Sequence, residues 1–192
     1  MNLFQKRWRD LRHPNKPNSD SDIIFTLSSA YVDLQTKLGL KSTGRAAISI
    51  KNIDGRSFSE AIEEISKLLD IFKNEFKLNY HTQSDSYGYL WIVLQDVKLE
   101  DILACMSAIG DSVEDQGFSN QLLAAVFEFS NGVSKQYLIY NYKHNKFYPF
   151  VPSTGEKTVN NDDQMKIMSV MMDQIPIEQD LSLWYPLWDL PF

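Results

Sequence analysis

The sequence contains a single cysteine, Cys105, and none of the histidine and cysteine spacings that bind transition metals. One thiol cannot form an internal disulfide, and Cys105 lies on the apolar stripe of a predicted helix, so we expect a buried thiol rather than a nucleophile. His13, His81 and His144 are far apart along the chain, and no CxxC, HExxH or HxH pattern occurs. The sequence therefore predicts no zinc site and no other cofactor.

Long apolar runs are also missing. No stretch approaches the roughly 20 apolar residues of a membrane-spanning helix, and residues 1–12, MNLFQKRWRDLR, carry charges where a signal peptide has its apolar region. The chain has 192 residues, of which 43% are hydrophobic and 23% charged, which is typical of one globular domain. We expect a cytoplasmic protein.

Charge is distributed unevenly along the chain. Residues 1–17 contain five basic residues and one acidic residue, a net charge of +4, whereas the whole chain carries −6. The remaining 175 residues therefore carry −10. A body this acidic argues against nucleic-acid binding by the folded domain, and only the N-terminal segment is suited to meet an anionic surface.

This N-terminal arm, residues 1–19, has an amphipathic pattern. Its apolar residues recur at three-to-four-residue spacing, and its basic residues fall mostly on other faces of a helix. Such a segment fits a short interfacial helix, in which each basic side chain near anionic lipid contributes about 1 kcal/mol. The candidate membrane contacts are Phe4, Arg7, Trp8, Arg9, Leu11 and Arg12.

Residues 20–192 read as one α+β domain. Apolar stripes predict helices over residues 21–38, 57–76 and 99–116, the second opened by a capping box of Ser57 and Glu60, and a Met-rich fourth helix follows the cap Asn160. Strand patterns form hairpins at residues 77–95, 122–143 and 135–152, and a further strand lies near residues 45–52. Without a βαβ alternation, we predict a mainly antiparallel sheet with three to four packed helices, loosely like the secretion-chaperone fold. The aromatic, proline-rich tail, residues 175–192, has no helical periodicity, and we expect it to pack on this domain.

The hairpin YNYKHNKFYPFVP, residues 140–152, contains five aromatic rings. Tyr148 and Phe150 share one face of the return strand and Phe147 the other, while Pro149 lacks a ladder donor and predicts an edge strand. Two lysines in an acidic body give little support to base stacking, which leaves core packing with an aromatic edge. If these rings are exposed, Phe147, Tyr148 and Phe150 are candidate partner-binding residues.

A second candidate is a group of carboxylates near the end of the third predicted helix. Asp111, Glu114 and Asp115 lie at helical spacings of three and four residues and can share a face. Such a cluster can contact a basic partner, or can serve acid-base or metal chemistry if burial raises a pKa. No nucleophile-and-base pair or phosphate loop accompanies it, so a solvated helix end is the simpler interpretation and a metal-dependent hydrolase is an alternative.

Four strings together resemble the PspA-associated PspAB family of prokaryotic phage-shock membrane-stress systems: DSYGYLW at 85–91, SAIGDSVEDQGF at 107–118, YNYKHNKFYPFVP at 140–152 and IPIEQDLSLWYPLW at 175–188. They stand in the family's order, and the resemblance runs from about residue 25 to 188. It implies a non-enzymatic accessory protein associated with a PspA-like membrane-remodelling coiled coil, and with a membrane-embedded zinc protease of the same systems. It carries over no catalytic residues.

Three hypotheses follow. The first is a cytoplasmic adaptor that binds a protein partner through the aromatic edge or the acidic helix end. The second is peripheral attachment to the inner face of the membrane through the arm. The third is the metal-dependent hydrolase, which requires the three carboxylates to converge in a cleft.

Overall fold

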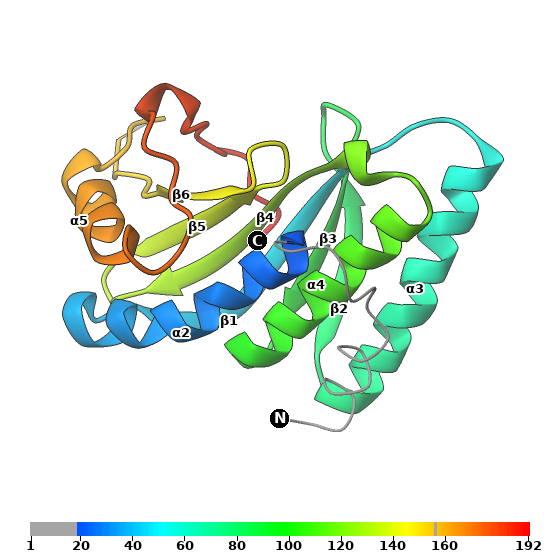
Figure 1. Ribbon diagram of the computed structural model, residues 1–192, viewed down its shortest axis with the longest axis horizontal. Helices are drawn as coiled ribbons and strands as arrows, with labels where there is room; N and C mark the ends of the chain where they lie inside the picture. Colours follow the sequence, from blue (N-terminus) through cyan, green and yellow to red (C-terminus); the bar gives the residue numbers. More distant parts are fainter. Residues whose placement is uncertain (1–18, 156) are drawn as a thin grey trace.

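The fold is an antiparallel sheet with helices on one face and an extended tail on the other (Figure 1). The structure is a computed structural model and describes residues 19–155 and 157–192. In chain order the described residues form α2 (Asp20–Leu38), β1 (Lys41–Lys51), α3 (Arg56–Phe76), β2 (Asn79–Ser84), β3 (Tyr89–Gln95), α4 (Leu99–Asp115), β4 (Leu122–Ser130), β5 (Lys135–Asn141), β6 (Lys146–Phe150) and α5 (Asn161–Met171). Short 3₁₀ turns lie at Ser119–Gln121 and Leu181–Leu183.

The six strands are ordered β2-β3-β1-β4-β5-β6, and every neighbouring pair is antiparallel. Three hairpins supply the pairs β2–β3, β4–β5 and β5–β6, as the sequence predicts. Strand β1 joins the two halves by pairing with β3 on one side and β4 on the other, so that Ala47 lies opposite both Val93 and Val126. The predicted α+β fold with a mainly antiparallel sheet is confirmed.

Helices α2, α4 and α3 lie side by side across one face of the sheet, with α5 beside the β6 edge (Figure 1). Their apolar stripes bury the main core against alternate residues of the strands, including Ile48, Ile92 and Phe127. Cys105 is one of these core residues, so the predicted buried thiol is confirmed, and burial raises the pKa of this thiol.

The C-terminal tail, residues 175–192, begins with Ile175 and Ile177 in the main core, and its residues 184–192 cover the opposite face of the sheet. The covered strand residues are Ala47, Trp91, Val93, Val126, Tyr137, Ile139, Tyr148 and Phe150. Trp188 meets Phe150 edge-on with ring centroids 5.2 Å apart, and Phe192 packs on Tyr137 at 6.1 Å. Because these strands alternate apolar residues on both faces, the sheet needs a second cover, and the tail provides it.

Edge strand β6 and the residue after it leave no outward N–H group open. The Phe147 N–H donates to the Pro176 carbonyl at 2.7 Å, Pro149 has no N–H, and the Val151 N–H donates to Gln164 Oε1 at 3.1 Å. The Phe147 carbonyl in turn accepts from the Glu178 N–H at 2.8 Å. The predicted edge strand is confirmed, and the chain closes this edge itself.

One predicted helix start is wrong. Helix α3 begins at Arg56 after Gly55, and no side chain caps it. Glu60 pairs with Arg56 Nε at 2.8 Å and does not form a capping box with Ser57. The predicted cap at α5 is correct, because the Asn160 side chain accepts from the Asp163 N–H at 3.1 Å.

Candidate functional site

The aromatic edge is buried. Phe147, Tyr148 and Phe150 are 0%, 3% and 3% exposed, so the expectation that these rings face a partner is not met. Phe147 points into the helix-covered core, where it packs on Tyr140 with ring centroids 5.0 Å apart. Tyr148 and Phe150 lie under the tail, and the Tyr148 hydroxyl donates to the Tyr185 carbonyl at 3.0 Å. Core packing is therefore the role that the structure gives to these three rings.

The predicted carboxylates end helix α4 without converging into a cleft. Asp111 is half-buried and accepts a hydrogen bond from the Ser21 hydroxyl, Glu114 is half-buried and Asp115 is exposed. Across residues 19–155 and 157–192, no group of three or more His, Cys, Asp or Glu side chains is arranged to hold a metal ion. The hydrolase alternative thus lacks its required donor set in this part of the chain.

The candidate membrane contacts Phe4, Arg7, Trp8, Arg9, Leu11 and Arg12 lie outside the described residues. Among the helices that the structure does describe, none is both long enough and apolar enough to cross a bilayer.

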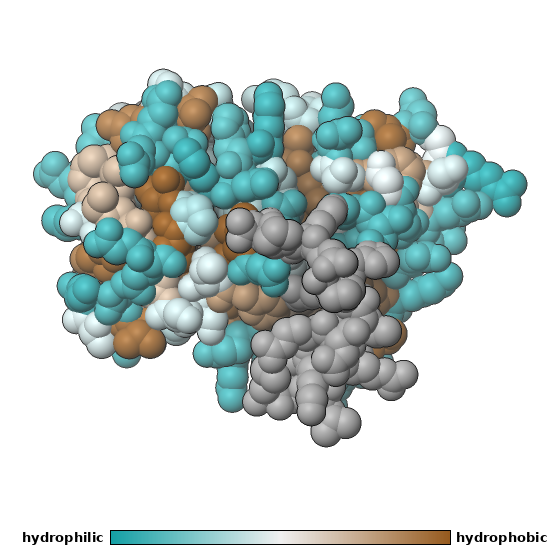
Figure 2. All heavy atoms as spheres, in the orientation of Figure 1, coloured by the Kyte–Doolittle hydropathy of each residue, from teal (hydrophilic) through white to brown (hydrophobic). Residues whose placement is uncertain are grey.

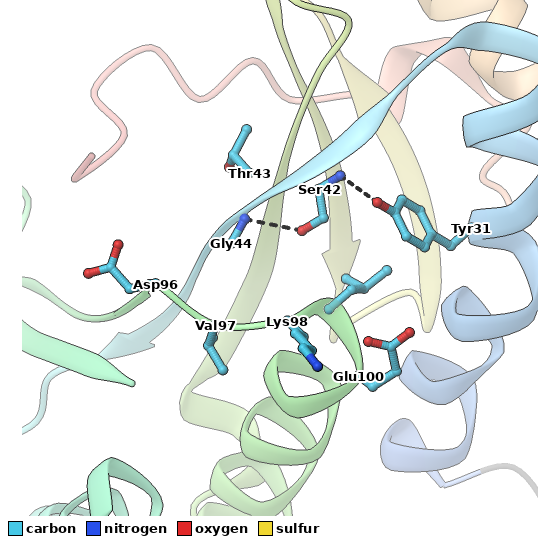
Figure 3. A pocket seen from close by; sticks show the side chains of 9 residues that line it. Tyr31, Ser42, Thr43, Gly44, Asp96, Val97, Lys98 and Glu100 are labelled. Atoms are coloured by element: carbon cyan, nitrogen blue, oxygen red, sulfur yellow. Dashed lines mark hydrogen bonds between the residues drawn. The ribbon is translucent and has the colours of Figure 1, made fainter. Parts of the chain in front are cut away.

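A shallow hollow of about 460 Å³ lies where β1 begins and α4 starts (Figure 3). Tyr31 reaches across from α2, and its hydroxyl accepts from the Ser42 N–H at 2.8 Å. Gly44 forms part of the floor with φ of 77°, and a Cβ there would lie only 3.0 Å from the Val97 carbonyl oxygen. Glycine is therefore required for β1 to pass this close to the chain before α4.

This hollow does not have the electrostatics of an anion site, although it adjoins a helix N-terminus. Glu100 and Asp101 occupy the first turn of α4 and already supply negative charge to the positive end of the helix. Burial and the neighbouring Glu100 raise the pKa of Asp101, which shows that negative charge is already crowded here. Lys98 is the one basic residue among those that line the hollow.

The more suitable binding surface lies between α5 and the tail. A cavity of about 180 Å³ opens beside β6, bounded by Tyr148 and Phe150 below, α5 on one side and the tail on the other. Met165, Leu181 and Tyr185 stand at its rim and are 38%, 54% and 51% exposed. Three large apolar side chains around one cavity differ from apolar residues scattered singly over a surface.

Met165 also belongs to a second, open hollow of about 490 Å³ between α5 and the end of α2, which includes Leu38 and Val170. The two hollows therefore share a wall and form one surface. Figure 2 shows hydrophobic residues among hydrophilic ones over the part of the molecule that contains α5. We call this the α5–tail surface and define it by Leu38, Met165, Val170, Leu181 and Tyr185.

Acidic groups border the α5–tail surface. Asp162 and Asp163 lie in the first turn of α5, and Asp180 precedes the turn that carries Leu181. Hydrogen bonds from the Ser182 side chain and backbone lower the pKa of Asp180, which favours its charged form. Lys166 is paired with Asp163 at 2.7 Å. An apolar surface with an acidic rim is complementary to apolar side chains flanked by basic ones.

A polar anchor fixes the tail beside this surface. The buried Glu178 pairs with Lys146 at 3.2 Å, and its backbone carbonyl accepts from Trp184 Nε1 at 2.9 Å. Burial disfavours the Glu178 carboxylate, but hydrogen bonds from the Asp180 N–H and from Lys146 outweigh it and lower the pKa of this carboxyl. Leu181 and Tyr185 are therefore presented from an anchored segment.

The sequence prediction missed this surface because its residues come from α2, α5 and the tail. One signal was available in the Met-rich helix. Ile167 and Met171 form the buried stripe of α5, whereas Met165 and Met172 fall off that stripe and are exposed. Exposed methionines are typical of adaptable binding surfaces.

Comparison with protein families gives a match over nearly the entire chain. The family model described as PspA associated protein B, PspAB, matches residues 2–192. The chain belongs to the PspAB family. The resemblance over residues 25–188 is thus confirmed, and the PspAB match extends further, over the N-terminal arm and the last residues of the tail. Members of this family are PspA-associated proteins, which is consistent with an accessory role in the phage-shock system. Neither the curated proteins nor the solved structures give a match.

Proposed function

We propose that this PspAB-family chain is a non-enzymatic adaptor of the membrane-stress response and that its α5–tail surface binds a PspA-like coiled-coil protein. The observation that carries the proposal is the grouping of exposed Met165, Leu181 and Tyr185 around one cavity. Family membership supports the choice of partner, because the family is defined by association with PspA.

The geometry suits a helix as the bound element. A coiled-coil protein presents apolar side chains at three-to-four-residue spacing with charged residues beside them. The α5–tail surface offers a cavity for one apolar side chain, and the adjoining hollow beside α5 adds Leu38 and Val170 among polar residues for the next. Its acidic rim favours basic flanking residues on that helix, so salt should slow association.

The test is a binding measurement with the purified PspA-like protein from the same source cell. Met165→Lys places a charge at the shared wall of the two hollows, and Leu181→Lys does the same at the cavity rim. We expect either variant to weaken binding by about 10-fold or more, as loss of a central interface contact does. Both side chains are exposed, so the free energy of unfolding should change little.

Val133→Lys is the matched control, because Val133 is 94% exposed in the β4–β5 turn. It should bind as tightly as the unmodified chain. Equal affinity for all three variants would show that the partner binds elsewhere. If the unmodified chain captures the membrane-embedded zinc protease but not the coiled coil, the proposed partner is wrong.

Peripheral attachment at the inner face of the membrane is a second candidate function. It is supported by the basic and aromatic pattern of residues 3–12, which the family match includes. The two functions are compatible, since an adaptor for a membrane-remodelling protein works close to lipid. Deletion of residues 1–17 tests it, and vesicle binding that survives the deletion would exclude the arm as the anchor.

A further inference from the structure

The C-terminal end of helix α4 is acidic, whereas most helices favour basic residues there. Its last residues include Asp111, Glu114 and Asp115, and the last turn contains no basic residue. A helix C-terminus carries partial negative charge, so carboxylates are disfavoured there and cations are favoured. Such a local conflict is expected where another group supplies compensation.

The start of α2 brings further acidic residues to the same place. Helices α2 and α4 pack together, and the Ser21 hydroxyl donates to Asp111 across their contact. Asp20 and Asp22 flank Ser21 in the first turn of α2. We call the resulting group the acidic helix-end cluster and define it by Asp20, Asp22, Asp111, Glu114 and Asp115.

A buried hydroxyl adds a second, independent observation at this cluster. Tyr142 is 7% exposed, and within the described residues its hydroxyl has no hydrogen-bond partner. Its ring packs edge-on against Tyr140, whose hydroxyl donates to Asp20, and a Cβ at Gly110, next to Asp111, would lie 3.3 Å from the Tyr142 hydroxyl. Burial raises the pKa of this phenol, and the charges of Asp20 and Asp111 raise it further. Buried hydroxyls ordinarily have partners, so an unmet hydrogen bond lies beside this cluster.

The N-terminal arm is a basic segment that joins the chain next to this cluster. Residues 1–17 carry a net +4, in contrast to −10 for the rest of the chain. Residue 18 joins Ser19, the N-cap of α2, and Ser21 two residues later touches Asp111. Attachment this close to the cluster gives the arm an effective concentration of about millimolar or more.

We propose that the arm docks on the acidic helix-end cluster of its own chain, with its lysines and arginines facing the carboxylates at the end of α4. The docked arm offsets the unfavourable charge at this helix end. The same side chains are those that would contact anionic lipid, so docking and membrane contact exclude each other. The cluster therefore controls the availability of the arm.

The test compares how fast trypsin cleaves the arm after Lys6, Arg7, Arg9 and Arg12 in the full chain. The double variant Glu114→Gln and Asp115→Asn removes two charges without changing side-chain size. We expect cleavage to be about 3- to 10-fold faster in this variant, as the loss of one or two ion pairs implies. Raising the salt concentration should speed cleavage of the unmodified chain in the same way.

The matched control is Glu63→Gln with Glu64→Gln, which removes the same charge from the exposed face of α3. Its cleavage rate should equal that of the unmodified chain. Carbodiimide cross-linking of a mixture of ¹⁴N- and ¹⁵N-labelled protein then reports which chains are joined. We expect cross-links from Lys6 or Lys16 to residues 111–115 in which both peptides carry the same nitrogen isotope, because both come from one chain.

Three results would overturn the proposal. Equal cleavage rates in the cluster variant and the unmodified chain would show that these carboxylates do not hold the arm. Cross-links only between isotopes would mean that the arm docks on a second copy. Protection of the arm only with phosphatidylglycerol vesicles would make lipid its sole partner.

Discussion

Gly39 and Gly44 both have left-handed φ angles, but only Gly44 lies close to another segment of the chain. Gly44 has φ of 77°, and a Cβ added there would lie 3.0 Å from the Val97 carbonyl oxygen. Gly39 has φ of 66°, and a Cβ added there would have no neighbouring atom within 4 Å. Alanine strains the backbone at both positions, by roughly 1 kcal/mol. At Gly44 it also forces β1 away from the chain before α4.

We therefore expect Gly44→Ala to lower the free energy of unfolding by about 1–3 kcal/mol more than Gly39→Ala. Urea denaturation of the two variants measures this difference. Equal losses would mean that β1 shifts at no cost and that the close contact is not a constraint.

Individual residues were predicted well where a local pattern decides their role. Asn160 caps α5 because its side chain reaches the Asp163 N–H, and this depends on residues three apart. The same reasoning failed at Ser57, because Arg56 extends α3 by one residue and pairs with Glu60. A capping box and an Arg-Glu pair at i, i+4 compete for one carboxylate, and the sequence does not rank them.

At the scale of elements, the tail is a structural layer of the domain. Trp188 is half-buried and packs on Phe150, so Trp188→Ala removes an aromatic contact and opens the covered face of the sheet. We expect a loss of about 1–3 kcal/mol in the free energy of unfolding and greater binding of a dye that reports exposed apolar surface.

Tyr185→Ala is the matched comparison within the tail. Its side chain is 51% exposed, and the hydrogen bond to Tyr148 uses the Tyr185 backbone carbonyl, which alanine retains. This variant should keep the stability of the parent. If both variants are equally stable, the tail contributes little to the fold.

The helices and strands were largely predictable from the sequence, but the segments that pack over them were not. Alternation in residues 140–150 correctly separates Phe147 from Tyr148 and Phe150. Whether an aromatic face meets solvent depends on what packs over it, and the tail that covers it has no periodicity to predict its path. Core packing was therefore the favoured interpretation of these rings, but the strand pattern alone left the exposed aromatic edge open as a candidate partner surface.

At the scale of the whole molecule, four buried tyrosines govern the response to alkaline pH. Burial, assisted by the nearby charge of Glu128, raises the pKa of Tyr137 to about 12, and burial also raises the pKa of Tyr140, Tyr142 and Tyr148. Below the ordinary tyrosine pKa of 10.0 these phenols are neutral in both the folded and unfolded states. Above it the unfolded chain loses protons that the folded chain keeps, so stability falls as pH rises.

We expect the free energy of unfolding to decline from about pH 10 towards pH 12, and these phenols to ionise together with unfolding. Phenolate absorbance and circular dichroism followed in one titration measure both events. Ionisation of all tyrosines near pH 10 with the fold intact would contradict the burial of these rings.

The order of the strands and the α5–tail surface depend on residues that are far apart in the sequence. Hairpins are local, so three of the five strand pairings followed from the sequence, whereas the insertion of β1 between β3 and β4 joins residues 38 to 89 positions apart. The α5–tail surface is likewise assembled from residues as distant as Leu38 and Leu181. No periodic pattern connects such residues, so only the folded chain reveals the surface.

The closed edge at β6 has a consequence for self-association. A sheet with two open edges can recruit strands at both ends and grow into a fibre. Here Phe147 and Val151 have committed their outward N–H groups within the chain and Pro149 has none, so recruitment at this end is blocked. Among the described strands, β2 is left as the open edge, and a sheet that extends from one end only stops at a pair. The closed edge therefore limits association of its own copies through the sheet to a pair.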